Sequence, residues 1–184
     1  MLCPFCRSPL DPGAPECPAC RVTFPRTSAL LGVLPRLSTG ISDGSHRLTP
    51  AETAKLLKAK DVLERKFPQV TLQVVIYSFP QEHPFGLHVF WVFNAASFAG
   101  DAHRGVENHT ILLAIDPDRA EGALMVGYGL ESFVSREALD HLLELAGPAW
   151  QLQRWLDGIM TVVNGLDPLL ESVAVLEDAS AGEF

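Results

Sequence analysis

The segment Thr110–Val126 reads TILLAIDPDRAEGALMV. It contains two apolar runs, Thr110–Ile115 and Ala123–Val126, and the turn-forming residues Asp116-Pro117-Asp118-Arg119 follow the first of them. Short runs of this type, separated by turn residues, are typical of two strands that pair directly. The sequence therefore predicts an antiparallel hairpin in the centre of the chain.

The residues before the hairpin predict a helix followed by a buried strand. Thr49-Pro50-Ala51-Glu52 combines an N-cap threonine, a proline at the first helical position and a glutamate at the third, which is a capping box. We expect this helix to reach about Lys66, because Pro68 cannot continue it. The β-branched run Val70–Tyr77 then has the length and composition of a buried strand.

The residues after the hairpin predict two further helices. Ser135 begins a helix that runs through Leu145, and we expect Gly147-Pro148 to break it. A second helix is predicted from Ala149 to Val163, with its large apolar side chains on one face. We expect the small and acidic residues 176–184 to form a flexible tail.

All four cysteines of the chain lie near its start, in Cys3-Pro4-Phe5-Cys6 and Cys17-Pro18-Ala19-Cys20. Two Cys-x-x-Cys pairs at this spacing can supply four thiolates to one tetrahedral Zn²⁺, which would leave no open position for water. The alternative is two disulfides, but no stretch that resembles a secretory signal precedes the cysteines. We therefore predict a structural zinc on Cys3, Cys6, Cys17 and Cys20 and a cytoplasmic location.

These patterns divide the chain into four parts. We predict a zinc ribbon at residues 1–24, a linker rich in glycine, proline and serine at 25–48, an α/β domain at 49–175 and the tail at 176–184. The linker carries one apolar island, Leu30–Leu34. This island either packs on the main domain or belongs to a free tether, and the sequence leaves both alternatives open.

Charge and hydropathy argue against two classes of partner. Residues 1–48 carry a net charge of +2, whereas residues 49–184 carry −10. A body this acidic would repel a phosphate backbone, so we expect no nucleic-acid partner. The longest apolar run, Leu87–Ala99, is interrupted by polar residues and is too short for a bilayer, so we expect no membrane insertion.

The stretch Met125-Val126-Gly127-Tyr128-Gly129-Leu130-Glu131, in register with the strand before it and the helices after it, resembles the TPM domain family. The resemblance covers about Leu48–Leu170 and implies a three-layer α/β sandwich, a small mixed sheet with helices on both faces. It also bears on Leu87–Asn94, which has the residue types of a strand but apolar positions at helical spacing. The family has a helix there, so we expect a helix.

The resemblance also implies activities, since some family members are described as acid phosphatases or calcium binders and others as modules of larger complexes. This chain has Ser135-Arg136 and Arg154-Trp155 where the family commonly carries acidic residues, and Glu107-Asn108-His109 in place of Asp-Asn-Gly. Because calcium needs several oxygen ligands at one site, Ca²⁺ is a less expected cofactor than zinc. Phosphatase chemistry loses support for the same reason.

Two functional hypotheses follow. The first is a cytoplasmic, non-catalytic module for protein interaction or regulation, with a candidate partner surface at Glu107, Asn108, Tyr128 and Glu131. The alternative is a metal-assisted, acid phosphatase-like hydrolase. Glu107, Asn108 and Glu131 could line a polar pocket with Asp116 and Arg119, or these residues could serve the backbone of turns. The partner's identity and the oligomeric state stay open.

Overall fold

The computed structural model describes residues 3, 5–6, 8–11, 14–31, 34–35, 37–38, 40–95 and 109–181, with only the backbone path for residues 24, 28, 95 and 173–181. Its centre is a four-stranded mixed sheet in the order β1-β2-β3-β4. The strands are β1 (Ile41–Asp43), β2 (Thr71–Ile76), β3 (Thr110–Asp116) and β4 (Glu121–Val126). β1, β2 and β3 are parallel.

The predicted hairpin is confirmed. β3 and β4 pair antiparallel, with Leu113 opposite Leu124 and Asp116 opposite Glu121. β2 is also confirmed as a buried strand, since all six of its residues are buried.

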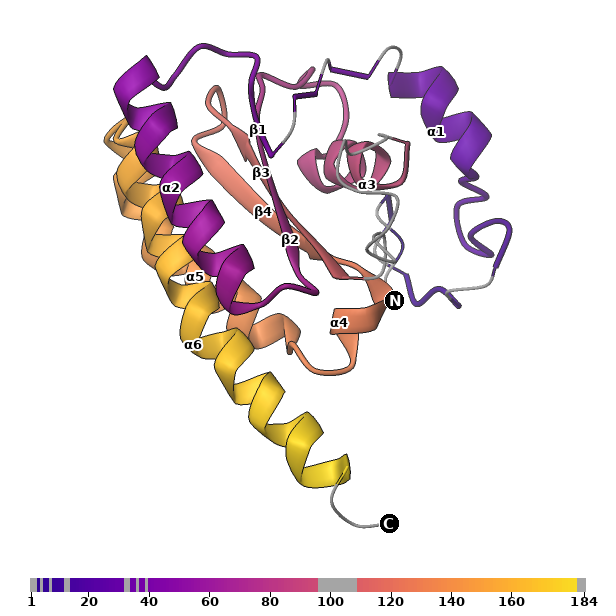
Figure 1. Cartoon of the computed structure of the whole chain (residues 1–184). Helices are drawn as coiled ribbons and strands as arrows, with labels where there is room; N and C mark the ends of the chain where they lie inside the picture. Colours follow the sequence, from indigo (N-terminus) through magenta and orange to yellow (C-terminus); the bar gives the residue numbers. More distant parts are fainter. Residues whose placement is uncertain are drawn as a thin grey trace.

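Helices cover both faces of the sheet, as the three-layer α/β sandwich requires (Figure 1). α2 (Pro50–Lys66), α5 (Arg136–Gln151) and α6 (Trp155–Ala181) cover one face, and α3 (Phe85–Ala95) covers the other. The strands supply a separate set of apolar side chains to each layer because successive residues point to opposite faces. The face toward α2, α5 and α6 carries Leu72, Val74, Ile76, Ile111, Leu113 and Ile115. The face toward α3 carries Val75, Leu112 and Ala114.

The start of α2 follows the sequence closely. Thr49 is the N-cap, its hydroxyl accepts a bond from the Glu52 amide, and the Glu52 carboxylate accepts one from the Thr49 amide at 2.8 Å. The Thr49 hydroxyl also donates to the Glu52 carboxylate. The bonds from the Thr49 amide and hydroxyl lower the pKa of the Glu52 carboxyl, because both stabilise its charged form. The predicted capping box is confirmed.

The segment predicted as a linker contributes the edge strand β1. Ile41–Asp43 pairs with Val74–Ile76, and the Val74 amide donates to the Gly40 carbonyl at 2.8 Å. Gly40 has a φ of +83°, a conformation that favours glycine. β1 therefore belongs to the central sheet although it lies in the predicted linker, because pairing with β2 stabilises a strand that has little local signal.

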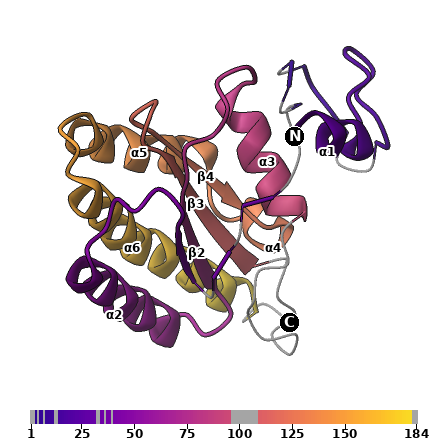
Figure 2. The same ribbon diagram turned by 90° about the horizontal axis from the view of Figure 1, so that it is seen from above.

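The apolar island packs on the body. α1 (Phe24–Leu31) lies on the α3 side of the molecule (Figure 2). Leu31, Leu34 and Leu37 pack against the core between α3 and the sheet. Of the two alternatives for the island, the structure therefore favours packing over a free tether.

The segment with conflicting signals is a helix, as the family resemblance implied. In α3, Val89 and Val92 are buried in the core between the helix and the sheet. Residue type favoured a strand here, and burial on a helical face overrides that preference.

The predicted break at Gly147-Pro148 is wrong. α5 continues through Pro148 to Gln151, and the chain turns instead at Gln153, which has a φ of +57°. Proline removes one amide donor from this last helical turn, while Ala146, Ala149 and Trp150 are buried and hold the turn in place. Helical backbone also continues to Ala181 in α6, beyond the predicted end at Val163 and into the segment expected as a flexible tail.

No helix in the described part of the chain combines the length and apolar character needed to cross a membrane.

Candidate metal centre

The two cysteine knuckles have the same backbone geometry. The Cys3 amide donates to the Ser8 carbonyl at 2.9 Å, and the Cys17 amide donates to the Val22 carbonyl at 3.0 Å. Each knuckle thus closes with a bond between its first cysteine and the residue five positions later. This repeated turn directs both sulfurs of each pair toward the same point.

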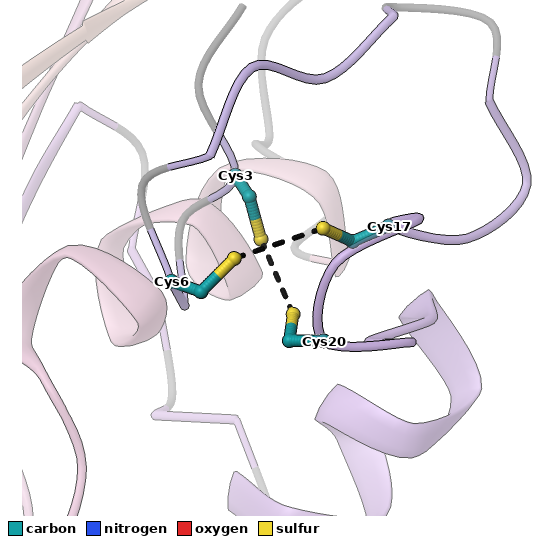
Figure 3. Close-up of side chains that lie close together, drawn as sticks. All are labelled: Cys3, Cys6, Cys17 and Cys20. Atoms are coloured by element: carbon teal, nitrogen blue, oxygen red, sulfur yellow. Dashed lines mark hydrogen bonds between the residues drawn. The ribbon is translucent and has the colours of Figure 1, made fainter.

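The four Sγ atoms form one compact cluster (Figure 3). All of them lie within 4.8 Å of one another. The Cys3 and Cys20 sulfurs are 3.7 Å apart, and so are the Cys6 and Cys17 sulfurs. A tetrahedral zinc with Zn–S bonds near 2.3 Å requires sulfurs about 3.8 Å apart. A disulfide would instead place two sulfurs about 2.05 Å apart.

The thiols sit in unequal environments. Cys3 and Cys17 are fully buried, whereas Cys6 is exposed. The side chain and amide of Ser8 lower the pKa of Cys6 to about 6, because both stabilise its thiolate by hydrogen bonding. Burial raises the pKa of Cys20 to about 12. A cation that recruits all four sulfurs must therefore displace a proton from Cys20 at neutral pH, so its affinity should rise with pH.

The chemistry of this donor set fits zinc better than a hard cation. Four thiolates are soft ligands, which suit Zn²⁺, whereas calcium and magnesium prefer oxygen. Four protein ligands also fill a tetrahedral site, so a bound zinc would hold the fold rather than activate water. The arrangement can stabilise a small element that has little core of its own.

The candidate partner surface is only partly described. Tyr128 and Glu131 both lie on α4 (Tyr128–Glu131) and are exposed, Tyr128 by 58%. The Gly127 amide donates to the Thr110 carbonyl at 2.9 Å, which places α4 beside the first residue of β3. Glu107 and Asn108 lie outside the described residues, so their predicted proximity to Tyr128 stays a prediction.

Sequence reasoning missed a second exposed aromatic side chain near α4. Phe133 is 41% exposed, whereas Leu130 and Val134 are buried. Helical spacing gives no signal for it, because Leu130, Phe133 and Val134 would share one face of a continued helix, whereas α4 ends at Glu131.

Asp116 and Arg119 serve the hairpin. Asp116 is fully buried, and its Oδ1 accepts bonds from the Asp118 amide at 3.0 Å and the Arg119 amide at 3.4 Å. Its other oxygen forms an ion pair with the Arg119 guanidinium. The two residues therefore fix the turn, and the backbone role considered from the sequence accounts for both.

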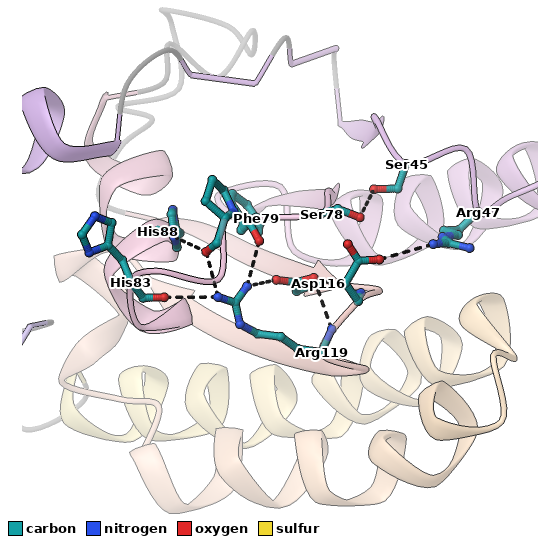
Figure 4. A network of polar contacts seen from close by, with 10 residues as sticks. Ser45, Arg47, Ser78, Phe79, His83, His88, Asp116 and Arg119 are labelled. Carbon is teal, nitrogen blue, oxygen red and sulfur yellow. Dashed lines mark hydrogen bonds and ion pairs between the residues drawn. The ribbon is translucent and has the colours of Figure 1, made fainter.

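The Arg119 guanidinium also holds the loop between β2 and α3 (Figure 4). It donates to the carbonyls of Phe79 at 3.1 Å, Pro80 at 2.8 Å and His83 at 3.2 Å. Both terminal nitrogens are thus engaged by the fold. This arrangement leaves Arg119 poorly placed to bind a phosphate, because binding would compete with these contacts.

His88 reinforces the same loop from α3. Its Nε2 lies 3.1 Å from the Pro80 carbonyl, and its ring packs on Phe79 with 5.2 Å between centroids. Burial lowers the pKa of His88, and the positive charge of Arg119 lowers it further. Neutral His88 can donate from Nε2 to the Pro80 carbonyl, so this contact needs no charge on the ring.

No protein-family model matches the sequence, and no curated protein does. Solved structures that share its fold include two N-terminal domains. The solution structure of the N-terminal domain of a protein from P. gingivalis is 17% identical, has a TM-score of 0.56, and the match covers 71% of this chain and 81% of that one. The N-terminal domain of cg2496 from Corynebacterium glutamicum is 16% identical, with a TM-score of 0.52 over 75% of this chain and 84% of that one. At these identities the likeness establishes the fold alone: an α/β sandwich, here preceded by four cysteines able to hold one metal ion.

Proposed function

We propose that this protein is a cytoplasmic, non-catalytic interaction module in which a structural zinc holds the N-terminal ribbon and a TPM-type α/β domain binds a protein partner. The observation that carries the zinc assignment is the pair of 3.7 Å sulfur contacts, which match the edge of a zinc–thiolate tetrahedron. A cytoplasmic location agrees with four cysteines that must stay reduced to bind metal.

The TPM assignment rests on two supports. The first is the stretch Met125–Glu131 with its flanking strand and helices, which resembles the family. The second is the fold, which is the α/β sandwich that the resemblance implied. Because fold alone does not carry function, the proposed role depends on what the surface residues can do.

An interaction role is favoured by exposed aromatic side chains on an ordered segment. Tyr128 and Phe133 are exposed, while Leu130 anchors the segment in the core and the Gly127 amide fixes it to β3. Exposed aromatic residues that are already ordered lose little entropy when a partner covers them. We therefore propose that Tyr128 and Glu131 belong to the partner surface.

The test is capture of partners by the full-length protein, compared between wild type and Tyr128→Ala. We expect a specific partner to be lost in Tyr128→Ala and retained in Leu152→Ala, whose side chain is also exposed but lies at the end of α5. The melting temperature of both variants should stay within about 3 °C of wild type, because surface substitutions usually change stability by about 0.5 kcal/mol or less. Unfolding of Tyr128→Ala, or equal capture by both variants, would count against this surface.

The hydrolase alternative is tested with a generic aryl phosphate. We expect no turnover above background at neutral pH, since Asp116 and Arg119 are engaged by the fold. Activity that follows the purified protein and disappears in Glu107→Ala or Asn108→Ala would favour the hydrolase instead.

A further inference from the structure

The four cysteines differ in their access to solvent. Cys3 and Cys17 are fully buried, Cys20 is half-buried and Cys6 is exposed. Oxidation of cysteine depends on thiolate character and on access to the oxidant. If all four sulfurs bind one metal as thiolates, residue exposure is the property that separates them, and Cys6 is the most exposed of the four residues.

The neighbour of Cys6 is suited to complete the reaction. Its Sγ lies 3.7 Å from the Sγ of Cys17, and this contact connects the two knuckles (Figure 3). A disulfide between these atoms requires a sulfur separation near 2.05 Å, so an approach of about 1.7 Å suffices. Because Cys17 is buried, it is poorly accessible to the oxidant yet adjacent to a modified Cys6.

We propose that Cys6 is an oxidant-sensitive modification site, that hydroperoxides are its substrates, and that Cys17 resolves the oxidised form into a disulfide between the knuckles. This inference rests on the zinc-bound ribbon proposed above. Its consequence is loss of the metal, since two sulfurs joined in a disulfide are no longer thiolate ligands.

The chemistry balances with hydrogen peroxide as the only oxidant. The Cys6 thiolate attacks one peroxide oxygen, the O–O bond breaks, and Cys6 becomes a sulfenic acid while hydroxide leaves. The Cys17 thiolate then attacks the Cys6 sulfur, forms the S–S bond and displaces a second hydroxide. Two thiolates lose two electrons in total, and the peroxide gains them.

The first test reads the order of disulfide formation from tryptic peptides. Cleavage after Arg7 and Arg21 places Cys3 and Cys6 in one peptide and Cys17 and Cys20 in the next. Reduced full-length protein is treated with peroxide below one equivalent per chain, quenched with an alkylating reagent, digested and analysed by mass spectrometry. A disulfide between the knuckles links the two peptides, whereas a disulfide within one knuckle leaves them separate.

We expect the earliest product to be the linked pair joined through Cys6 and Cys17, with Cys3 and Cys20 alkylated. Fragment ions distinguish this link from one through Cys3 and Cys20. An earliest product with a disulfide inside one peptide, or with the Cys3–Cys20 link, would overturn the proposal.

The second test compares two matched ligand variants. Cys6→His and Cys3→His each retain a donor set of three cysteines and one histidine, which still binds zinc. Peroxide-driven zinc release, followed with a metal-sensitive dye, should be about tenfold slower in Cys6→His and within about twofold of wild type in Cys3→His. Equal slowing in both variants would contradict a special role for Cys6.

Zinc content before oxidation separates the two proposals. A reduced wild-type chain without zinc overturns the zinc ribbon and this inference together. If the reduced chain holds one zinc, but neither the release of that zinc nor the order of disulfide formation depends on Cys6, this inference alone is overturned. If neither histidine variant binds zinc, the order of disulfide formation in the wild-type protein tests the role of Cys6.

Discussion

The N-terminal cysteine element and the α/β body are stabilised by different means. Cys3 and Cys17 are the only buried apolar side chains among the described residues before Gly40. The body instead buries a large core on both faces of its sheet. An element of this size cannot bury enough apolar surface to fold alone, and a metal can replace the missing core. The difference teaches that packing accounts for the body, whereas the cysteine element needs another source of stability, for which we propose the metal.

Chelation should give the largest effect, and it should be confined to one region. A structural zinc contributes about 10–16 kcal/mol to a metal-folded unit, so its removal should unfold the residues before α1 and leave the body folded. Trypsin should then cut at Arg7 and Arg21 much faster, while the thermal transition of the body moves by only a few degrees. If chelation also abolishes the thermal transition of the body, the body depends on the metal as well, which contradicts the proposed difference between the two regions.

Asp116→Asn should weaken the body without affecting metal content. The substitution leaves the Arg119 guanidinium without its buried partner, which typically costs about 3–5 kcal/mol for a pair of this kind. Asp118→Asn is the matched control, because Asp118 pairs with Arg47 across 3.6 Å at an exposed site and should change stability by less than about 1 kcal/mol. Urea unfolding measures both, and equal effects would show that the buried pair contributes little.

Gly158→Ala should destabilise the packing between α5 and α6. A methyl group on Gly158 would lie 2.2 Å from Trp150 Nε1, and Trp150 is fully enclosed. Overpacking of this kind costs about 1–3 kcal/mol. Gly86→Ala is the control on α3, where an added methyl group meets nothing within 4 Å, so its stability should stay within about 0.5 kcal/mol of wild type. In thermal denaturation, the melting temperature of Gly158→Ala should be clearly lower than that of Gly86→Ala.

The smallest expected effect is a pH dependence that belongs to the body. Burial lowers the pKa of His88 below its ordinary value of 6.5, so the folded state binds the proton less readily than the unfolded state. The stabilising contribution is therefore present above pH 6.5 and declines as the pH falls below that value. Unfolding by urea at pH 7.5 and pH 5.5 should show the decline, and it should be smaller in His88→Gln. If stability declines equally in His88→Gln, titratable groups other than His88 cause the pH dependence.

Local sequence signals predicted much of the body. The capping box at Thr49, the β-branched run of β2 and the turn residues at Asp116 each fix their own element with few neighbours, so they could be interpreted without the fold. The cysteine spacing likewise indicated the metal centre, because the donor type and separation define the site directly.

Elements that depend on distant contacts were harder to predict. β1 has three residues and gains its stability from pairing with β2, so a window around Ile41 indicated a linker. The continuation of α5 through Pro148 depends on Trp150, which packs closely against Gly122 and Gly158 from other elements. The helical state of α3 required the family resemblance, because its residue types favoured a strand.

Zinc content is the most direct test of the central claim that a metal holds the N-terminal element. Elemental analysis of the reduced full-length protein, freshly purified without chelator, should give one zinc per chain, and Cys17→Ser should lower that value. A wild-type chain without zinc, or an intact mass that has lost the hydrogens of two disulfides, would contradict the account.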